Sequence, residues 1–87
     1  MRIPPHSAEA EKSVLGSVLL DRDAVVAVVE FLHPEFFYED RHQKIFSAVV
    51  SLYQQREPVD VVTVAEKLKN AKTLEEVGGM EYLKELV

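Results

Sequence analysis

The central feature of this sequence is residues 39–55, EDRHQKIFSAVVSLYQQ. Apolar residues recur there at i, i+4 and i+7 in two neighbouring registers, which places two apolar stripes side by side along one helix. The two sets are Ile45, Val49 and Leu52, and Phe46, Val50 and Tyr53. Only a narrow polar strip is left to face water. The pattern predicts a central helix that neighbouring helices cover on most sides, as in a small all-α domain.

The composition bounds the class of protein. The chain has 87 residues, which is room for one domain of residues 1–87 with a modest core. It has no cysteine, so it can form neither a disulfide nor a thiolate metal site, and a reducing cytoplasm is the expected location. The apolar runs are too short to cross a membrane. The net charge of −5 argues against a surface built mainly to bind DNA phosphates.

A first helix is predicted from Ser7 to about Leu20. Ser7 is a good N-cap residue, and Glu9 and Glu11 fall in the first turn, where the helix dipole favours negative charge. Gly16 lies inside this helix at a cost of about 1 kcal/mol relative to alanine. Its presence predicts a close crossing with another helix.

Two valine-rich runs, residues 25–32 and 59–64, leave helix and strand both open on local preference alone. We predict that both are helical, because no other segment offers a strand partner with hairpin turn chemistry. Asp21 can cap the first of these helices and Asp60 the second. Pro34 sets the latest end of the first, since the residue before a proline avoids the helical region.

The connections carry their own signals. Of the three consecutive aromatic residues 36–38, at least two are expected in the core, with Phe36 as the exception. Residues 73–76 read as a capping box between Thr73 and Glu76, and Gly78 suits a left-handed cap. The last predicted helix, from residue 80, is still apolar where the sequence stops at Val87, which suggests a piece of a longer protein.

Patterns that carry chemistry are absent from the sequence. The three histidines at positions 6, 33 and 42 have no metal-ligand spacing, and there is neither a phosphate-binding loop nor a nucleophile motif. His42 reads as a capping histidine or one at the edge of the core. The carboxylate pairs are explained as helix caps and solvated faces. We therefore predict no catalytic, cofactor or metal site.

Five stretches, taken in order, resemble one family. They cover the chain from end to end and are IPPHSAEAE with SVLG (residues 3–16), FY with HQKIF (37–46), EPVDVVT (57–63), LEEVGG (74–79) and Tyr82-Leu83. In this order and spacing they are similar to the N-terminal domain of the bacterial replicative DNA helicase, the DnaB family. The resemblance implies a compact bundle of about six short helices around the central helix of residues 39–55.

The resemblance also implies a role. In this family the N-terminal domain is not the motor: it forms the collar of a hexameric ring, packs as a trimer of dimers, and offers docking surface to primase and, in some bacteria, to a helicase loader. ATP, Mg²⁺ and most DNA contacts belong to a RecA-like C-terminal domain absent here. The fragment is then no enzyme, although its parent is an ATP-dependent helicase. The family's domain continues past Val87 into a helical hairpin, and Phe36 stands where an acidic residue is common.

For partner contacts we predict Glu9, Glu11 and Tyr82, because an acidic helix start beside an amphipathic aromatic residue can meet a basic partner. The alternative makes the two acids dipole partners and Tyr82 a core residue. A different function is also open, a stand-alone acidic adaptor domain outside replication. A gene continuing past Val87 into a phosphate-binding loop excludes it, and a stop codon there favours it.

Overall fold

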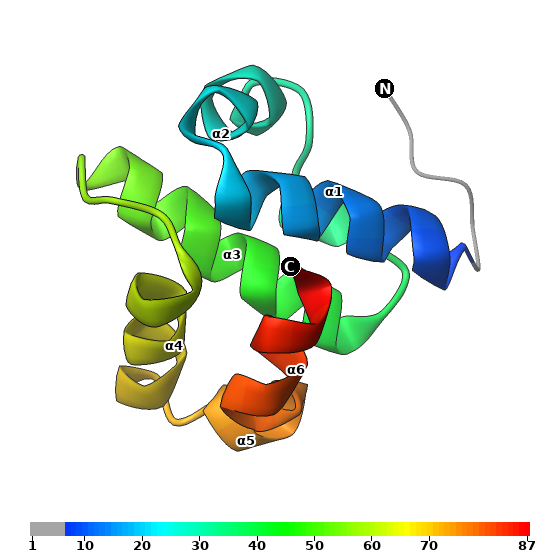
Figure 1. Cartoon of the computed structure of the whole chain (residues 1–87), viewed down its shortest axis with the longest axis vertical. Coiled ribbons are helices and arrows are strands. Elements are labelled where there is room, and N and C mark those ends of the chain that lie inside the picture. Colours follow the sequence, from blue (N-terminus) through cyan, green and yellow to red (C-terminus); the bar gives the residue numbers. More distant parts are fainter. Residues whose placement is uncertain (1–6) are drawn as a thin grey trace.

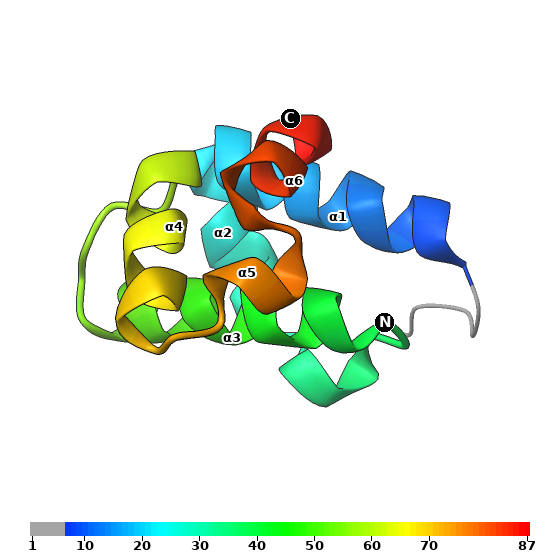
Figure 2. The ribbon, with the colours of Figure 1, turned by 90° about the horizontal axis from the view of Figure 1, so that it is seen from below.

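The computed structural model describes residues 7–87, and this part of the chain contains helices and no strand. The elements are α1 (Ala8–Leu20), α2 (Arg22–Val29), the 3₁₀ turn η1 (Pro34–Phe36), α3 (Asp40–Gln54), α4 (Val61–Asn70), α5 (Leu74–Val77) and α6 (Gly79–Leu86). Helix α3 runs through the middle and packs against α1, α2, η1, α4 and α5, while α6 closes the bundle over α1, α4 and α5 (Figures 1 and 2). The predicted all-α bundle around residues 39–55 is confirmed.

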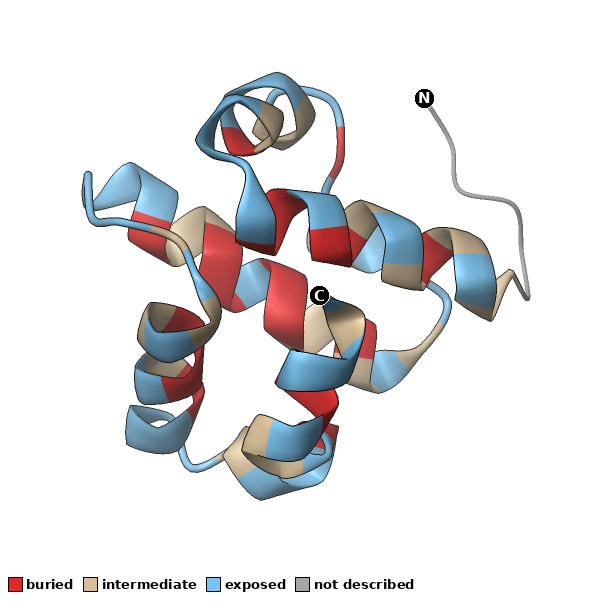
Figure 3. Cartoon of the chain, in the orientation of Figure 1, coloured by how far each residue is buried: buried red, intermediate tan, exposed pale blue. Residues whose placement is uncertain are grey.

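The core is made by the inward faces of these helices (Figure 3). Of the two stripes predicted on α3, the first is fully buried, but the second emerges from the core towards its C-terminal end. Phe46 is 0% exposed, Val50 is half-buried and Tyr53 is 37% exposed. The core therefore covers the N-terminal part of α3 more completely than its last turn, and Tyr53 is left at the surface.

Aspartates start both valine-rich helices, as predicted. The Asp21 carboxylate accepts the backbone N–H of Asp23 at 2.9 Å. Asp60 accepts the backbone N–H of Thr63 at 2.8 Å, and the Thr63 hydroxyl oxygen accepts the Asp60 N–H at 2.9 Å, so α4 begins with a reciprocal capping box. Each cap satisfies donors that the first helical turn leaves without partners. Residues 25–29 of the first run and 61–64 of the second are helical, and no part of either run is a strand.

Ser7 takes the N-cap position of α1, but its side chain makes no capping hydrogen bond, and two predictions for the connections are wrong. The Thr73 side chain does not cap α5, because its hydroxyl donates backwards to the Leu68 carbonyl at 3.3 Å, against the end of α4. Only one of the three aromatics enters the core: Phe37 is 1% exposed, whereas Phe36 and Tyr38 are 40% and 58% exposed. Phe36 ends the 3₁₀ turn and Phe37 is extended, with φ −78° and ψ 139°; successive side chains of an extended chain point to opposite sides, so Tyr38 does not follow Phe37 into the core.

Three helices end with a residue in the left-handed region. Gly78 does so after α5 with φ 111°, as predicted. Arg56 after α3 and Lys72 after α4 adopt φ 60° and 62° without being glycine. Behind Arg56 the next N–H, from Glu57, bonds the Leu52 carbonyl at 2.9 Å, which is the six-to-one bond of a Schellman cap.

Glycine at these two positions is expected to stabilise the domain. An L-residue in the left-handed region is strained by about 1–2 kcal/mol, and replacement by glycine removes this strain. Part of the resulting stabilisation is lost because glycine has more conformational freedom in the unfolded chain. Arg56→Gly and Lys72→Gly should each raise the free energy of unfolding in urea by about 0.5–1 kcal/mol. Glu66→Gly, at an exposed interior position of α4, is the matched control and should lower it by about 1 kcal/mol. A loss at Arg56 or Lys72 equal to that of the control contradicts the assignment.

Candidate functional site

Glu11, one of the three residues predicted to contact a partner, is buried. Its side chain is 1% exposed, on the inward face of α1. One carboxylate oxygen accepts the backbone N–H of Tyr38 at 2.5 Å, and the other accepts that of Glu39 at 3.4 Å. These two N–H groups lie at the entry to α3, where the helix dipole favours a negative charge. The carboxylate therefore ties α1 to the start of the central helix.

His42 continues this contact into the core. Its Nδ1 lies 2.6 Å from the Glu11 carboxylate and its Nε2 lies 2.5 Å from the Tyr82 hydroxyl. Because the carboxylate already accepts two backbone N–H groups, it acts as an acceptor, so Nδ1 of His42 is the donor. In the neutral imidazole Nε2 is then free to accept the Tyr82 O–H. Three helices, α1, α3 and α6, are joined by one buried chain of hydrogen bonds.

Tyr82 forms the outer end of this chain. The ring is stacked on His42 at 17° and 5.9 Å between centroids, and the Arg41 guanidinium lies over the ring with Cζ 3.9 Å from its centroid. The Arg41 Nε also donates to the Glu39 carboxylate at 3.1 Å. Burial raises the pKa of the Tyr82 hydroxyl, against the lowering effect of the Arg41 guanidinium. The phenol stays protonated at neutral pH and can donate to His42.

The structure separates the three predicted contact residues. Glu9 is exposed, as expected. The expectation that Glu11 also lies at an exposed helix start is wrong, because Glu11, Leu15 and Val18 share the i, i+4, i+7 face that points into the core. Tyr82 is only 6% exposed. Direct contact with a partner therefore remains a prediction. The exposure of Glu9 favours it for that residue over Glu11 and Tyr82.

Two members of the site were missed from sequence, His42 and Arg41. His42 is not at the edge of the core but 0% exposed within it. A signal was present, since His42 lies three and four residues before Ile45 and Phe46 and so extends their apolar stripe by one turn. A polar residue that continues an apolar stripe needs a buried partner. The stripe on α1 carries the same signal at Glu11.

The Glu11, His42 and Tyr82 side chains form a buried cluster that joins α1, α3 and α6. All the buried polar side-chain atoms in residues 7–87 have a hydrogen-bond partner.

Within residues 7–87 no three histidine, aspartate or glutamate side chains are grouped so that they could bind a metal ion. None of the described helices is long and apolar enough to span a bilayer. His6 and the Pro4-Pro5 pair lie outside the described residues. Next to the buried cluster, Arg41 lies over the Tyr82 ring and Glu9 is exposed at the start of α1.

Tyr82→Phe tests the outer hydrogen bond through its pH dependence. Because the pKa of Tyr82 is raised, its phenol keeps its proton in the folded state to higher pH than in the unfolded chain. The stability that it contributes is present below pH 10 and lost as the pH rises beyond it. Phenylalanine does not titrate, so the variant should lose less stability than the parent as the pH rises above about 10. At pH 7 it should be about 1–3 kcal/mol less stable, since Nε2 of His42 loses its donor.

Lys44 titrates in the same alkaline range, and both proteins share it. Hydrogen bonds to Asp40 and Glu76 raise its pKa, so its contribution is also lost above its ordinary value. The difference between Tyr82→Phe and the parent therefore isolates the phenol. Urea unfolding at a series of pH values measures it, and identical slopes in the two proteins contradict the assigned hydrogen bond.

Comparison with known proteins gives a consistent result. Residues 3–87 match the family model described as the DnaB-like helicase N-terminal domain. The chain is 53% identical over 85 residues to the replicative DNA helicase DnaB of Geobacillus stearothermophilus and 46% identical over 85 residues to the replicative DNA helicase DnaC of Bacillus subtilis strain 168. In both, the match covers 98% of this chain and 19% of the relative, so the chain spans about a fifth of the length of these curated relatives.

A solved structure gives the same result for the fold. The crystal structure of the N-terminal domain of DnaB helicase from Mycobacterium tuberculosis is similar with a TM-score of 0.90 and 44% sequence identity. The match covers 97% of this chain and 58% of that chain. The likeness therefore includes almost every residue described here, among them the three helices joined by the Glu11, His42 and Tyr82 side chains.

Proposed function

Because this chain belongs to the DnaB-like helicase N-terminal domain family, we propose that it is the non-catalytic module by which a replicative DNA helicase assembles and docks its partners. The module packs with copies of itself, as dimers and as a trimer of dimers in a hexameric ring. It offers a surface to primase and to a helicase loader. The parent protein unwinds DNA in the cytoplasm with ATP and Mg²⁺ bound by its C-terminal domain.

The observation that carries this proposal is the match to a DnaB N-terminal domain along 97% of the chain, at 44% identity and a TM-score of 0.90. The sequence supports the non-catalytic part, since residues 1–87 contain no phosphate-binding loop. The net charge of −5 supports a protein partner more than direct contact with DNA phosphates. Identity to replicative helicases also weighs against an adaptor outside replication.

For primase docking we propose a division of roles at the start of α1. Glu9 contacts a basic group of the partner directly, because its carboxylate is exposed. Glu11 and Tyr82 act as positioning residues, which fix α1 and α6 against α3 through His42. The partner then meets a surface whose three helices are held in one arrangement. In this division Glu9 has a direct part in docking, and the buried Glu11 and Tyr82 have an indirect part.

Sedimentation equilibrium of the chain with the primase C-terminal domain, at low and at high salt, tests the proposal. We expect a complex at low salt that weakens at high salt, because exposed charges are screened there. Glu9→Lys should weaken it about tenfold, a change of about 1.4 kcal/mol. Glu66→Lys, an exposed glutamate on α4, is the matched control with the same charge change. Absence of a complex, or equal loss in both variants, removes primase docking at Glu9 from the proposal.

A further inference from the structure

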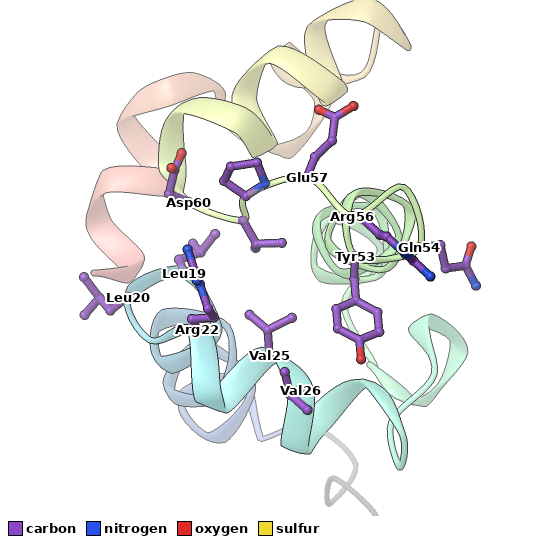
Figure 4. Close-up of a pocket in the computed structure, with 12 residues that line it drawn as sticks. Leu19, Leu20, Arg22, Val25, Val26, Tyr53, Gln54, Arg56, Glu57 and Asp60 are labelled. Carbon is purple, nitrogen blue, oxygen red and sulfur yellow. The ribbon is translucent and has the colours of Figure 1, made fainter.

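A groove opens on the surface formed by the end of α1, by α2, by the last turn of α3 and by the connection to α4 (Figure 4). Its volume is about 790 Å³. Glu9 is eleven residues from Leu20 along α1, so about 16 Å separates the start of that helix from the groove. The groove is therefore a surface distinct from the proposed docking site, and its interpretation does not rest on the proposed function.

The floor and walls of the groove are apolar. Leu19 and Val25 form part of the floor and are 4% and 3% exposed. Val26, Tyr53 and Leu20 line it and remain 47%, 37% and 71% exposed. In Figure 4 the Tyr53 ring extends into the space between α3 and α2. Apolar side chains gathered around a hollow of this kind are typical of a surface that another molecule covers.

The rim of the groove carries charge that the domain does not use. Arg22 and Arg56 line it, and neither guanidinium makes a hydrogen bond or an ion pair within residues 7–87. Two acids, Glu57 and Asp60, lie on the connection to α4, but the Asp60 carboxylate already caps that helix. The Glu57 carboxylate is exposed and has no side-chain partner in residues 7–87, so the rim presents two unpaired guanidinium groups beside a tyrosine together with one unpaired carboxylate on the connection to α4. Arginine and tyrosine around an apolar centre are the composition that dominates binding energy at protein interfaces.

We propose that this groove binds an acidic amphipathic helix of a partner protein. Its apolar side chains, spaced at i, i+4 and i+7, enter between α2 and α3, and its carboxylates pair with Arg22 and Arg56. Charge complementarity favours such an occupant, because a guanidinium pairs with a carboxylate in two parallel hydrogen bonds. Apolar anchors at helical spacing are the general way in which a groove recognises a helix. Tyr53 and Val26 supply the contact area between the two charges.

The probe for this proposal is a pair of designed helical peptides of about five turns. Both carry leucine at i, i+4, i+7 and i+11; one carries glutamate at the flanking positions and the other carries lysine there. Amide chemical shifts of the chain are followed by nuclear magnetic resonance during titration. We expect the glutamate peptide to shift residues 19–26 and 53–60 and to bind at least about tenfold tighter than the lysine peptide.

Two variants then identify the side chains responsible. Arg22→Glu should reduce binding of the glutamate peptide about tenfold and improve binding of the lysine peptide, and an acid at the first residue of a helix does not harm folding. Lys69→Glu, an exposed lysine of α4 outside the groove, is its matched control. Tyr53→Ala should also reduce binding about tenfold. Phe36→Ala, an exposed aromatic outside the groove, should not.

Four results overturn the proposal. They are shifts that map outside the groove, equal binding of the two peptides, no binding of either peptide at millimolar concentration, and self-association of the chain that Arg22→Glu abolishes. The last result assigns the groove to a second copy of this chain. Because Glu9 takes no part in these measurements, the groove proposal can be wrong while primase docking at the start of α1 is right. Equally, primase docking there can be wrong while the groove proposal is right.

Discussion

Replacement of Glu11 by alanine is expected to lower the free energy of unfolding by about 3–5 kcal/mol, the range for breaking a buried charge-assisted contact. The substitution leaves the N–H groups of Tyr38 and Glu39 and Nδ1 of His42 without their acceptor. The His42 contact is buried and the two backbone contacts are part-buried, and an unpaired buried donor costs about 1–3 kcal/mol, so the estimate is reached without any change in the apolar core. For a small domain this is a large share of the total stability.

Glu9→Ala is the natural control for this change. The two glutamates are two residues apart on the same helix turn, yet Glu9 is exposed and Glu11 is buried. We expect Glu9→Ala to change the free energy of unfolding in urea by no more than about 0.5 kcal/mol at pH 7. Equal costs for the two substitutions would show that the Glu11 carboxylate does not hold α1 to the start of α3.

A double-mutant cycle with His42→Ala makes the test more specific. Removing either partner leaves the other buried with this hydrogen bond lost, so each single change counts that penalty separately. The double variant removes both groups together, and its cost should fall short of the sum of the two single costs by about 0.5–3 kcal/mol. Strict additivity contradicts the contact between Glu11 and His42.

The parts of the fold that could be predicted from the sequence are those whose signals lie within a few neighbouring residues. The spacing of Ile45, Val49 and Leu52 defines the central helix, because a 3.6-residue period is visible within the segment itself. Asp21 and Asp60 begin their helices through contacts two or three residues away. Such signals do not depend on the rest of the molecule, so they decide correctly between helix and strand in both valine-rich runs.

The candidate site could not be predicted from such short-range signals. Glu11, His42 and Tyr82 are separated by 31 and 40 residues, and only the packing of α1, α3 and α6 brings them together. Sequence shows at most that Glu11 and His42 continue apolar stripes, which indicates burial but names no partner. At Thr73 the sequence has a complete local capping motif, but the motif does not form. The Thr73 hydroxyl donates instead to the Leu68 carbonyl at the end of the preceding helix. Contacts between elements override local preference in both cases.

Gly16→Ala is the second change with a large expected effect, and here the two physical terms oppose each other. Alanine favours a helix over glycine by about 1 kcal/mol, which would stabilise α1. A Cβ at this position, however, would lie 2.2 Å from the backbone carbonyl oxygen of Leu86, well inside van der Waals contact. The predicted close crossing is thus confirmed, with α6 as the second helix. Because a backbone atom cannot rotate away, α6 must move, and we expect a net loss of about 1–3 kcal/mol.

Ser17→Ala, at the exposed neighbouring position of α1, is the control and should leave stability unchanged or raise it slightly. Amide hydrogen exchange should show lost protection in α6 while α3 keeps its own. Since α6 carries Tyr82, we expect its displacement also to weaken the hydrogen bond to His42. Gly16→Ala should therefore cost less in a Tyr82→Phe background than in the parent, because that bond is already absent there. A gain of about 1 kcal/mol in the parent, the propensity term alone, contradicts a tight crossing at Gly16.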